Sequence, residues 1–318
     1  MEPRSELHVI FGAGQVGTEL ARQLMSDGRS VRLVRRSAGA GPPGVALVRA
    51  DARDRAAVGD APRGAAVIYH CMNAPYSAAI WAEELPRLQE NLVTASVRAN
   101  ARLVVLDNLY ALGRTGGRPM SEATPFAPCS RKGEIRARLA ESLEASRRAG
   151  TVRAVTGRAS DFFGPGGVNS YFEKRLFGPA LAGKKAAMIV EPDTRHTYHF
   201  IPDVAAGLAT LGADAGADGT FMLPCEPAVT TRELIALMAT ALGKPIAFSR
   251  VPPLALRLAG LAVPIVRELN EMAYQWEQPF VVNDAKFRAR YGDRSTPLAE
   301  GARRTVEWAV ASFGRAGA

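Results

Sequence analysis

The chain has 318 residues, of which 47% are hydrophobic and 22% are charged, a composition typical of a globular protein with one large or two modest domains. Its formal charge of +9 comes from arginines spread along the chain without interleaved aromatic residues, which argues against a nucleic-acid partner. The longest apolar stretch, residues 251–266, is interrupted by prolines and an arginine and is too short to predict a membrane span or a membrane partner. Three scattered cysteines and the absence of a signal-peptide pattern indicate a cytoplasmic protein.

The first predicted strand, residues 9–11, leads into three glycines with the spacing G-x-G-x-x-G, and a helical pattern of apolar residues follows at once. In such a turn Gly12 allows the sharp bend, Gly14 lets backbone N–H groups approach a pyrophosphate, and Gly17 lets the helix lie close to the strand. The start of the helix then faces the anion. The motif therefore predicts a dinucleotide site, in which the contacting residues are Gly12, Gly14, Gln15, Val16 and Gly17.

Strand and helix patterns alternate over the first half of the chain. Helices are expected at 81–100, with a break at Pro86, and at 130–149, and a further helix begins after Thr230 or Thr231. This alternation predicts an α/β fold with a doubly wound parallel Rossmann sheet. The six expected strands are 9–11, 30–34, 45–48, 66–69, 102–106 and 152–155.

The residues after the second strand bear on the choice of cofactor. An NAD-binding protein usually has Asp or Glu there, whereas this chain has Arg35, Arg36 and Ser37. Two guanidinium groups and a hydroxyl suit a 2′-phosphate, so NADP(H) is predicted ahead of NAD(H). The alternative is that the arginines only face solvent. Asp51, with Ala52 beside it, is expected to bind the adenine amino group or to serve only as a turn residue.

Five stretches resemble the NAD-dependent epimerase/dehydratase family of extended short-chain dehydrogenases/reductases. They are the glycine motif at 12–17, Ala50-Asp51, residues 67–70, residues 164–166, and residues 196–205, which are similar to the family's F-V-H-V-D-D-V-A signature. The resemblance implies a seven-stranded Rossmann domain and a smaller C-terminal α/β substrate lobe. On that basis residues 1–165 form the NADP-binding domain, the chain returns to it at about 196–212, and residues 166–195 and 213–318 form the lobe.

The catalytic pattern departs from that family. Typical members carry Y-x-x-x-K, in which the tyrosine exchanges a proton and the lysine holds the nicotinamide ribose. Lys132 is at the lysine position, but Pro128 replaces the tyrosine and Asn108 replaces the usual serine. We therefore expect Tyr110 to be the acid/base, Asn108 to orient a carbonyl oxygen, and Lys132 to hold the ribose. The alternatives are that Tyr110 only packs under its loop and that Lys132 is solvated.

Further positions are expected to line the site because they follow other strands. Asn73 would contact cofactor or substrate, and Tyr76 is the second choice for the acid. Ala159 follows the sixth strand, where the family lines the nicotinamide site, and Asp161 is either a base or a turn residue. Tyr171 is expected on the substrate side. His196 and His199 are three apart, which in a strand puts them on opposite faces, so no metal site is predicted.

These observations predict an NADP(H)-dependent oxidoreductase that acts on a hydroxyl or ketone of a small, hydrophobic metabolite. A redox-neutral epimerase, dehydratase or cyclase with bound NADP is the first alternative, and a non-catalytic NADP-sensing protein is the second. A small-molecule substrate is the expected partner, and a homodimer is possible.

Overall fold

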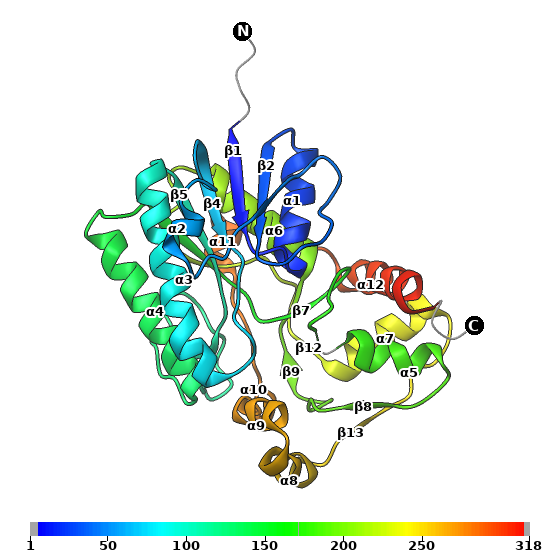
Figure 1. The fold of residues 1–318 in the computed structure, drawn as a ribbon. Coiled ribbons are helices and arrows are strands. Elements are labelled where there is room, and N and C mark those ends of the chain that lie inside the picture. Colours follow the sequence, from blue (N-terminus) through cyan, green and yellow to red (C-terminus); the bar gives the residue numbers. More distant parts are fainter. Residues whose placement is uncertain (1–5, 171, 315–318) are drawn as a thin grey trace. The chain divides into compact units, whose positions relative to one another are not determined.

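The computed structural model describes residues 6–170 and 172–314. The chain divides into two compact units (Figure 1). Unit 1 contains Met1–Ala111, Arg131–Ala159 and Val204–Leu223, and unit 2 contains Leu112–Ser130, Ser160–Asp203 and Pro224–Ala318.

Unit 1 is built on a seven-stranded sheet in the order β11-β6-β5-β4-β1-β2-β3. Every neighbouring pair is parallel, and the order reverses between β1 and β4. This confirms the doubly wound Rossmann sheet, and the reversal is the point where such sheets bind ligands. The strands are β1 (Leu7–Phe11), β2 (Ser30–Arg35), β3 (Ala46–Arg49), β4 (Ala65–His70), β5 (Arg102–Asp107), β6 (Ala154–Arg158) and β11 (Gly219–Met222).

The core of unit 1 lies between this sheet and two long helices. Ile68 and Leu103 from the strands are fully buried in one cluster with Trp81 and Leu92 of α3 and with Ile135 of α4. Gly212 of α6 lies so close to Tyr69 of the sheet that a Cβ there would be 2.1 Å from the phenol oxygen. The helices are α1 (Gln15–Ser26), α2 (Arg55–Val58), α3 (Ala78–Ala99), α4 (Arg131–Arg148) and α6 (Ile201–Ala213).

The predicted break at Pro86 is wrong, because α3 continues through it. Proline removes one backbone donor from a helix. The buried side chains before and after it, Leu85 and Leu88, pack in the core, and this packing outweighs the lost hydrogen bond.

Unit 2 consists of three two-stranded sheets and a group of helices. β7 (Asp161–Phe163) pairs with β10 (Tyr198–Phe200), β9 (Arg195–His196) with β12 (Val229–Thr230), and β8 (Ala186–Met188) with β13 (Phe248–Arg250). A capping box between Thr230 and Glu233 starts α7, as expected for a helix after Thr230. The helices are α5 (Gly178–Leu181), α7 (Thr231–Leu242), α8 (Pro253–Ala262), α9 (Pro264–Glu271), α10 (Tyr274–Glu277), α11 (Ala285–Tyr291) and α12 (Leu298–Phe313), with a π-helical turn η2 (Glu173–Phe177). The 3₁₀ turn η1 (Tyr110–Leu112) begins in unit 1, and its last residue is the first residue of unit 2.

The units divide the chain differently from the expected domain boundaries. Residues 213–223 join unit 1 because β11 pairs with β6. Residues 112–130 join unit 2, where the Met120 N–H donates to the Val281 carbonyl (2.7 Å) and the Asn283 N–H donates to the Met120 carbonyl (2.8 Å). None of the helices in the described part of the chain is both long enough and apolar enough to span a bilayer.

Candidate active site

The glycine turn joins β1 to α1, and two of its glycines are required by the backbone itself. Gly12 has a φ of 112°, and a Cβ there would lie 2.7 Å from the Cys71 carbonyl carbon. A Cβ on Gly17 would lie 1.9 Å from the Gly12 carbonyl oxygen. By contrast, a Cβ on Gly14 would meet no described atom within 4 Å. The turn is therefore tightly packed at Gly12 and Gly17 and open at Gly14, at the start of α1. This shape fits a pyrophosphate.

Three arginines gather where β2 and β3 end. The Arg35 guanidinium donates to Ser37 Oγ (3.3 Å) and to the Ala40 carbonyl (3.1 Å), so its own loop holds it. Arg36 is exposed, and its carbonyl accepts a hydrogen bond from Arg49 Nε (3.2 Å). Arg49 faces Arg35 across the two strands. It was missed in the sequence, although its place at the end of the third strand would have indicated it.

Asp51 follows β3 and is held in an ion pair. Its carboxylate accepts from Arg53 Nη2 (2.6 Å) and from the Arg53 backbone N–H (3.0 Å), and the hydrogen bond from the guanidinium lowers the pKa of Asp51 to about 2. Arg53 also reaches Glu84 of α3 (2.7 Å). Ala52 is buried, and its carbonyl accepts from Asn91 Nδ2 (2.9 Å). The adenine contact stays a prediction for both residues.

The predicted catalytic residues come together at the carboxyl ends of β4 and β5. The hydroxyls of Tyr76 and Tyr110 lie 3.3 Å apart. Lys132, in the first turn of α4, is fully buried, and its Nζ lies 4.9 Å from the centre of the Tyr76 ring. Trp81 of α3 supports both tyrosines, since it stacks on Tyr110 at 6.1 Å and meets Tyr76 edge-on at 5.5 Å. Separate segments of unit 1 thus place two phenols and an ammonium group in one cluster.

The two asparagines beside the tyrosines have their carbonyl oxygens engaged. Asn108 Oδ1 accepts from the Tyr110 N–H (3.1 Å), which fixes the turn that carries Tyr110. Asn73 Oδ1 accepts from Arg136 Nη2 (3.0 Å) and from the Ala74 N–H (3.0 Å). Each asparagine would therefore approach a ligand with its amide NH₂ group.

A buried ion cluster lies next to these residues. Asp107, at the end of β5, accepts from Arg158 Nε (3.2 Å) and from Arg136 Nη1 (3.4 Å), and the three side chains are only 7%, 5% and 11% exposed. The Arg136 guanidinium also lies 4.8 Å above the Trp81 ring. Arg136 thus connects Asp107, Asn73 and Trp81. This cluster is not recognisable in the sequence, because its members come from different elements and form no motif.

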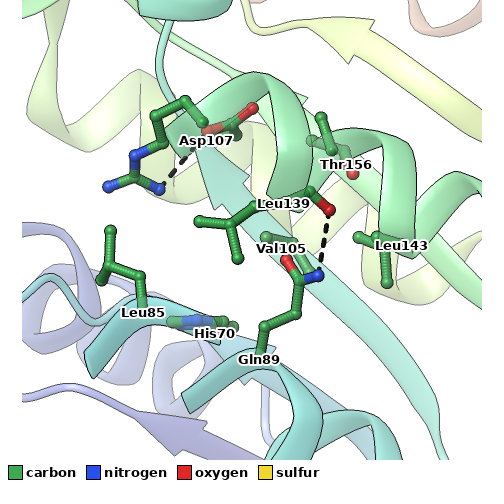
Figure 2. Close-up of a pocket in the computed structure, with 10 residues that line it drawn as sticks. His70, Leu85, Gln89, Val105, Asp107, Leu139, Leu143 and Thr156 are labelled. Carbon is green, nitrogen blue, oxygen red and sulfur yellow. Dashed lines mark hydrogen bonds and ion pairs between the residues drawn. The ribbon is translucent and has the colours of Figure 1, made fainter. Parts of the chain in front are cut away.

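Asp107 and Arg136 also line a small pocket between α3, α4 and the sheet (Figure 2). His70 is 7% exposed there, and burial lowers its pKa to about 4, so the ring is neutral at physiological pH. Gln89 Nε2 closes one side by donating to the Leu139 carbonyl (2.9 Å).

Unit 2 holds Asp161 and the two histidines. Asp161 Oδ2 lies 2.8 Å from His196 Nε2. Ser160 contacts both rings, through its Oγ to His196 (3.3 Å) and through its N–H to His199 Nδ1 (3.0 Å). The expected separation of the histidines on opposite faces of one strand is therefore wrong, because the chain between them divides into β9 and β10. Residues 6–170 and 172–314 contain no group of three His, Cys, Asp or Glu side chains arranged for a metal ion.

Two further predicted residues complete the set. The Ala159 N–H donates to the Asp107 carbonyl (3.1 Å) in unit 1. Tyr171 lies outside the described residues.

The parallel sheet with its glycine turn defines a dinucleotide-binding Rossmann protein with a second unit. The model of the NAD-dependent epimerase/dehydratase family matches residues 9–221, and the chain belongs to this family. Its cofactor class is accordingly a nicotinamide dinucleotide. No functionally curated protein matches the chain in sequence.

Solved structures with the same fold include several sugar-nucleotide enzymes. Thermus thermophilus UDP-glucose 4-epimerase, in complex with NAD, has a TM-score of 0.76 and 19% identity over 95% of this chain and 98% of its own. DesIV, a dTDP-glucose 4,6-dehydratase from Streptomyces venezuelae with NAD bound, has a TM-score of 0.78 and 18% identity over 97% and 98%. At this level of identity the likeness shows the fold alone.

Proposed function

We propose that the protein catalyses a redox-neutral epimerisation or dehydration of a hydroxyl-bearing small molecule, with a nicotinamide dinucleotide retained through the turnover. Family membership and the epimerases and dehydratases among the similar structures support this reaction class over net oxidation or reduction. The observation that carries the proposal is the cluster of Tyr76, Tyr110 and Lys132, which offers two phenols in place of the missing Y-x-x-x-K tyrosine.

The chain would hold the cofactor through the glycine turn, Arg36 and Lys132. The bound nicotinamide ring supplies reversible hydride transfer. Tyr110 exchanges the proton of the substrate hydroxyl. The Tyr76 hydroxyl hydrogen-bonds to the Tyr110 hydroxyl and stabilises the charge that develops on the Tyr110 oxygen. Lys132, which is fully buried with its Nζ 4.9 Å from the centre of the Tyr76 ring, would hold the nicotinamide ribose beside the phenol pair. Asn108 donates from its amide NH₂ to the substrate oxygen.

Purified protein tests this proposal with NAD⁺ or NADP⁺ and a panel that contains UDP-glucose, dTDP-glucose and small apolar ketones and alcohols. We expect products detectable by NMR without a matching net change in absorbance of the reduced cofactor. Tyr110→Phe should lower kcat by about 10²–10⁴-fold and leave cofactor affinity unchanged, whereas Tyr76→Phe should have the smaller effect. Full activity of Tyr110→Phe would exclude the acid/base role.

Net oxidation or reduction with NADP(H) is the second candidate, and the arginines at the ends of β2 and β3 favour it. Arg36 and Arg49 offer two guanidinium groups to a 2′-phosphate, and Arg35 holds the loop between them. Stoichiometric consumption of NADPH during turnover would establish this reaction in place of the redox-neutral one. A complete lack of turnover on every compound, with ligand-dependent association to another protein, would instead indicate the sensing role.

The choice of cofactor is tested separately by fluorescence titration with NADPH and NADH. We expect NADPH to bind more tightly, and Arg36→Ala to weaken it about tenfold by removing a charge-assisted hydrogen bond, with little change for NADH. Equal affinities in the wild-type protein would contradict the role of the arginines, and tighter binding of NADH would assign NAD(H), the cofactor found in the similar structures.

A further inference from the structure

Among the described residues, several exposed large apolar side chains are grouped on two consecutive helices of unit 2 and the residue that joins them. α8 and α9, joined at Val263, form a helical hairpin (residues 253–271) at one end of unit 2, away from α5, α7 and α12 (Figure 1). Leu254, Leu258 and Leu261 are 67%, 59% and 82% exposed, and their spacing puts them on one face of α8. Val263 and Ile265 continue the patch into α9. An apolar patch of this kind usually marks an interaction surface.

The two helices of the hairpin pack against each other through specific contacts, so the exposure of the leucines does not result from poor packing of the hairpin. Gly260 is buried where the helices cross, and a Cβ there would lie 2.6 Å from Asn270 Nδ2. Asn270 in turn donates to the Leu256 carbonyl (2.7 Å). These contacts fix α9 on one side of α8 and leave Leu258 and Leu261 on the surface.

The only charged side chains in the segment that carries the patch are positive. Residues 251–267 contain no Asp or Glu and two arginines, Arg257 and Arg267, both exposed and without an ion-pair partner among the described residues. The next acidic residues along the chain are Glu268, which is buried, and Glu271, which is half-buried. A second copy of the chain would bring the same cations against this patch, whereas an anionic lipid surface offers both negative headgroups and an apolar layer.

We propose that the α8–α9 hairpin docks the protein on membranes that contain anionic phospholipids. Leu254, Leu258 and Leu261 enter the boundary between headgroups and acyl chains, and the two arginines pair with lipid phosphates. The helices lie on the membrane and do not cross it, in agreement with the lack of a spanning helix among the described residues. This proposal departs from the expectation of no membrane partner, and it is independent of the proposed catalytic function.

Co-sedimentation of the full chain with lipid vesicles tests the proposal. We expect binding to vesicles of phosphatidylcholine mixed with phosphatidylglycerol and much weaker binding to phosphatidylcholine alone. Leu258→Asp with Leu261→Asp should abolish binding, and Arg257→Gln with Arg267→Gln should weaken it about tenfold or more. The matched control is Val310→Asp on α12, because Val310 is also an exposed apolar residue (43%). The Val310→Asp protein should bind the vesicles as the wild-type protein does.

Several results would overturn the proposal. They are the absence of wild-type binding, equal binding to neutral and anionic vesicles, and unchanged binding of the double aspartate variant. Analytical ultracentrifugation without lipid tests whether a second copy of the chain binds the patch instead. Self-association that the double aspartate variant loses would assign the patch to an interface between copies. Circular dichroism of each variant verifies that the chain is folded.

Discussion

The glycine turn and the tyrosine cluster are both parts of the candidate site, but they are specified in different ways. The turn is contiguous, and its backbone alone explains why Gly12 and Gly17 are glycine. The cluster is assembled from side chains of separate segments, with Tyr76 and Tyr110 in contact only because β4 and β5 are neighbours. Local sequence therefore determines the proposed cofactor site, whereas tertiary packing assembles the groups that we propose for the chemistry.

The largest effect should come from breaking the turn. Gly17→Val should abolish cofactor binding and lower the free energy of unfolding by more than about 4 kcal/mol, because its Cβ would lie 1.9 Å from the Gly12 carbonyl oxygen and the helix would have to move. Chemical denaturation and NADPH titration measure the two effects.

Gly14→Ala is the matched control for the turn. Its Cβ meets no described atom within 4 Å, so the free energy of unfolding should change by less than about 1 kcal/mol, while the affinity for the dinucleotide falls because the methyl group occupies the space over the turn. A Gly14→Ala protein that binds NADPH normally would contradict the placement of the pyrophosphate.

The contrast between local sequence and tertiary packing also explains which features could be predicted from the sequence. Strand periodicity and glycine spacing predicted the sheet and the turn, because both depend on neighbouring residues. Lys132 was found through its place in a family motif. The partners of Asp107 could not be found this way, since Arg136 and Arg158 are distant in sequence and the pairing depends on how α4 lies on the sheet. Pro86 was misjudged because packing on both sides of it overrides a local rule.

The ion cluster gives the second prediction. Asp107→Ala should lower the free energy of unfolding by about 3–5 kcal/mol, because it leaves the buried guanidinium of Arg158 and the partly buried one of Arg136 without their shared carboxylate. Urea denaturation measures the change.

Asp193→Ala provides the comparison for that variant. Asp193 pairs with Arg232 at the surface, where the side chains are 61% and 57% exposed, so no measurable loss of stability is expected. Equal effects of the two variants would mean that Asp107 contributes no more than a surface ion pair.

The smallest expected effect is that of His70 on stability, and it should be measurable only at acid pH. His70 lies in the pocket beside the Asp107 ion cluster. Burial lowers its pKa to about 4 in the folded protein, whereas the unfolded chain titrates near its ordinary value of about 6.5. Between these values the unfolded chain binds the proton and the folded chain does not. The contribution of the neutral His70 ring to the free energy of unfolding is therefore complete above about pH 6.5, and it is lost as the pH falls toward about 4.

His70→Gln should accordingly remove up to about 2 kcal/mol of the difference in unfolding free energy between about pH 7 and about pH 5. Urea denaturation at both pH values measures this difference. His8 has its pKa lowered to about 4 by burial too, but its ring contacts Tyr69 (3.0 Å) and not the cluster. His8→Gln should thus reduce the acid sensitivity by a similar amount. Neither variant should change the pH profile of turnover above about pH 6.5, because both rings are neutral there. A changed profile above that pH for His70→Gln alone would contradict the assignment of His70 as a neutral, purely stabilising residue.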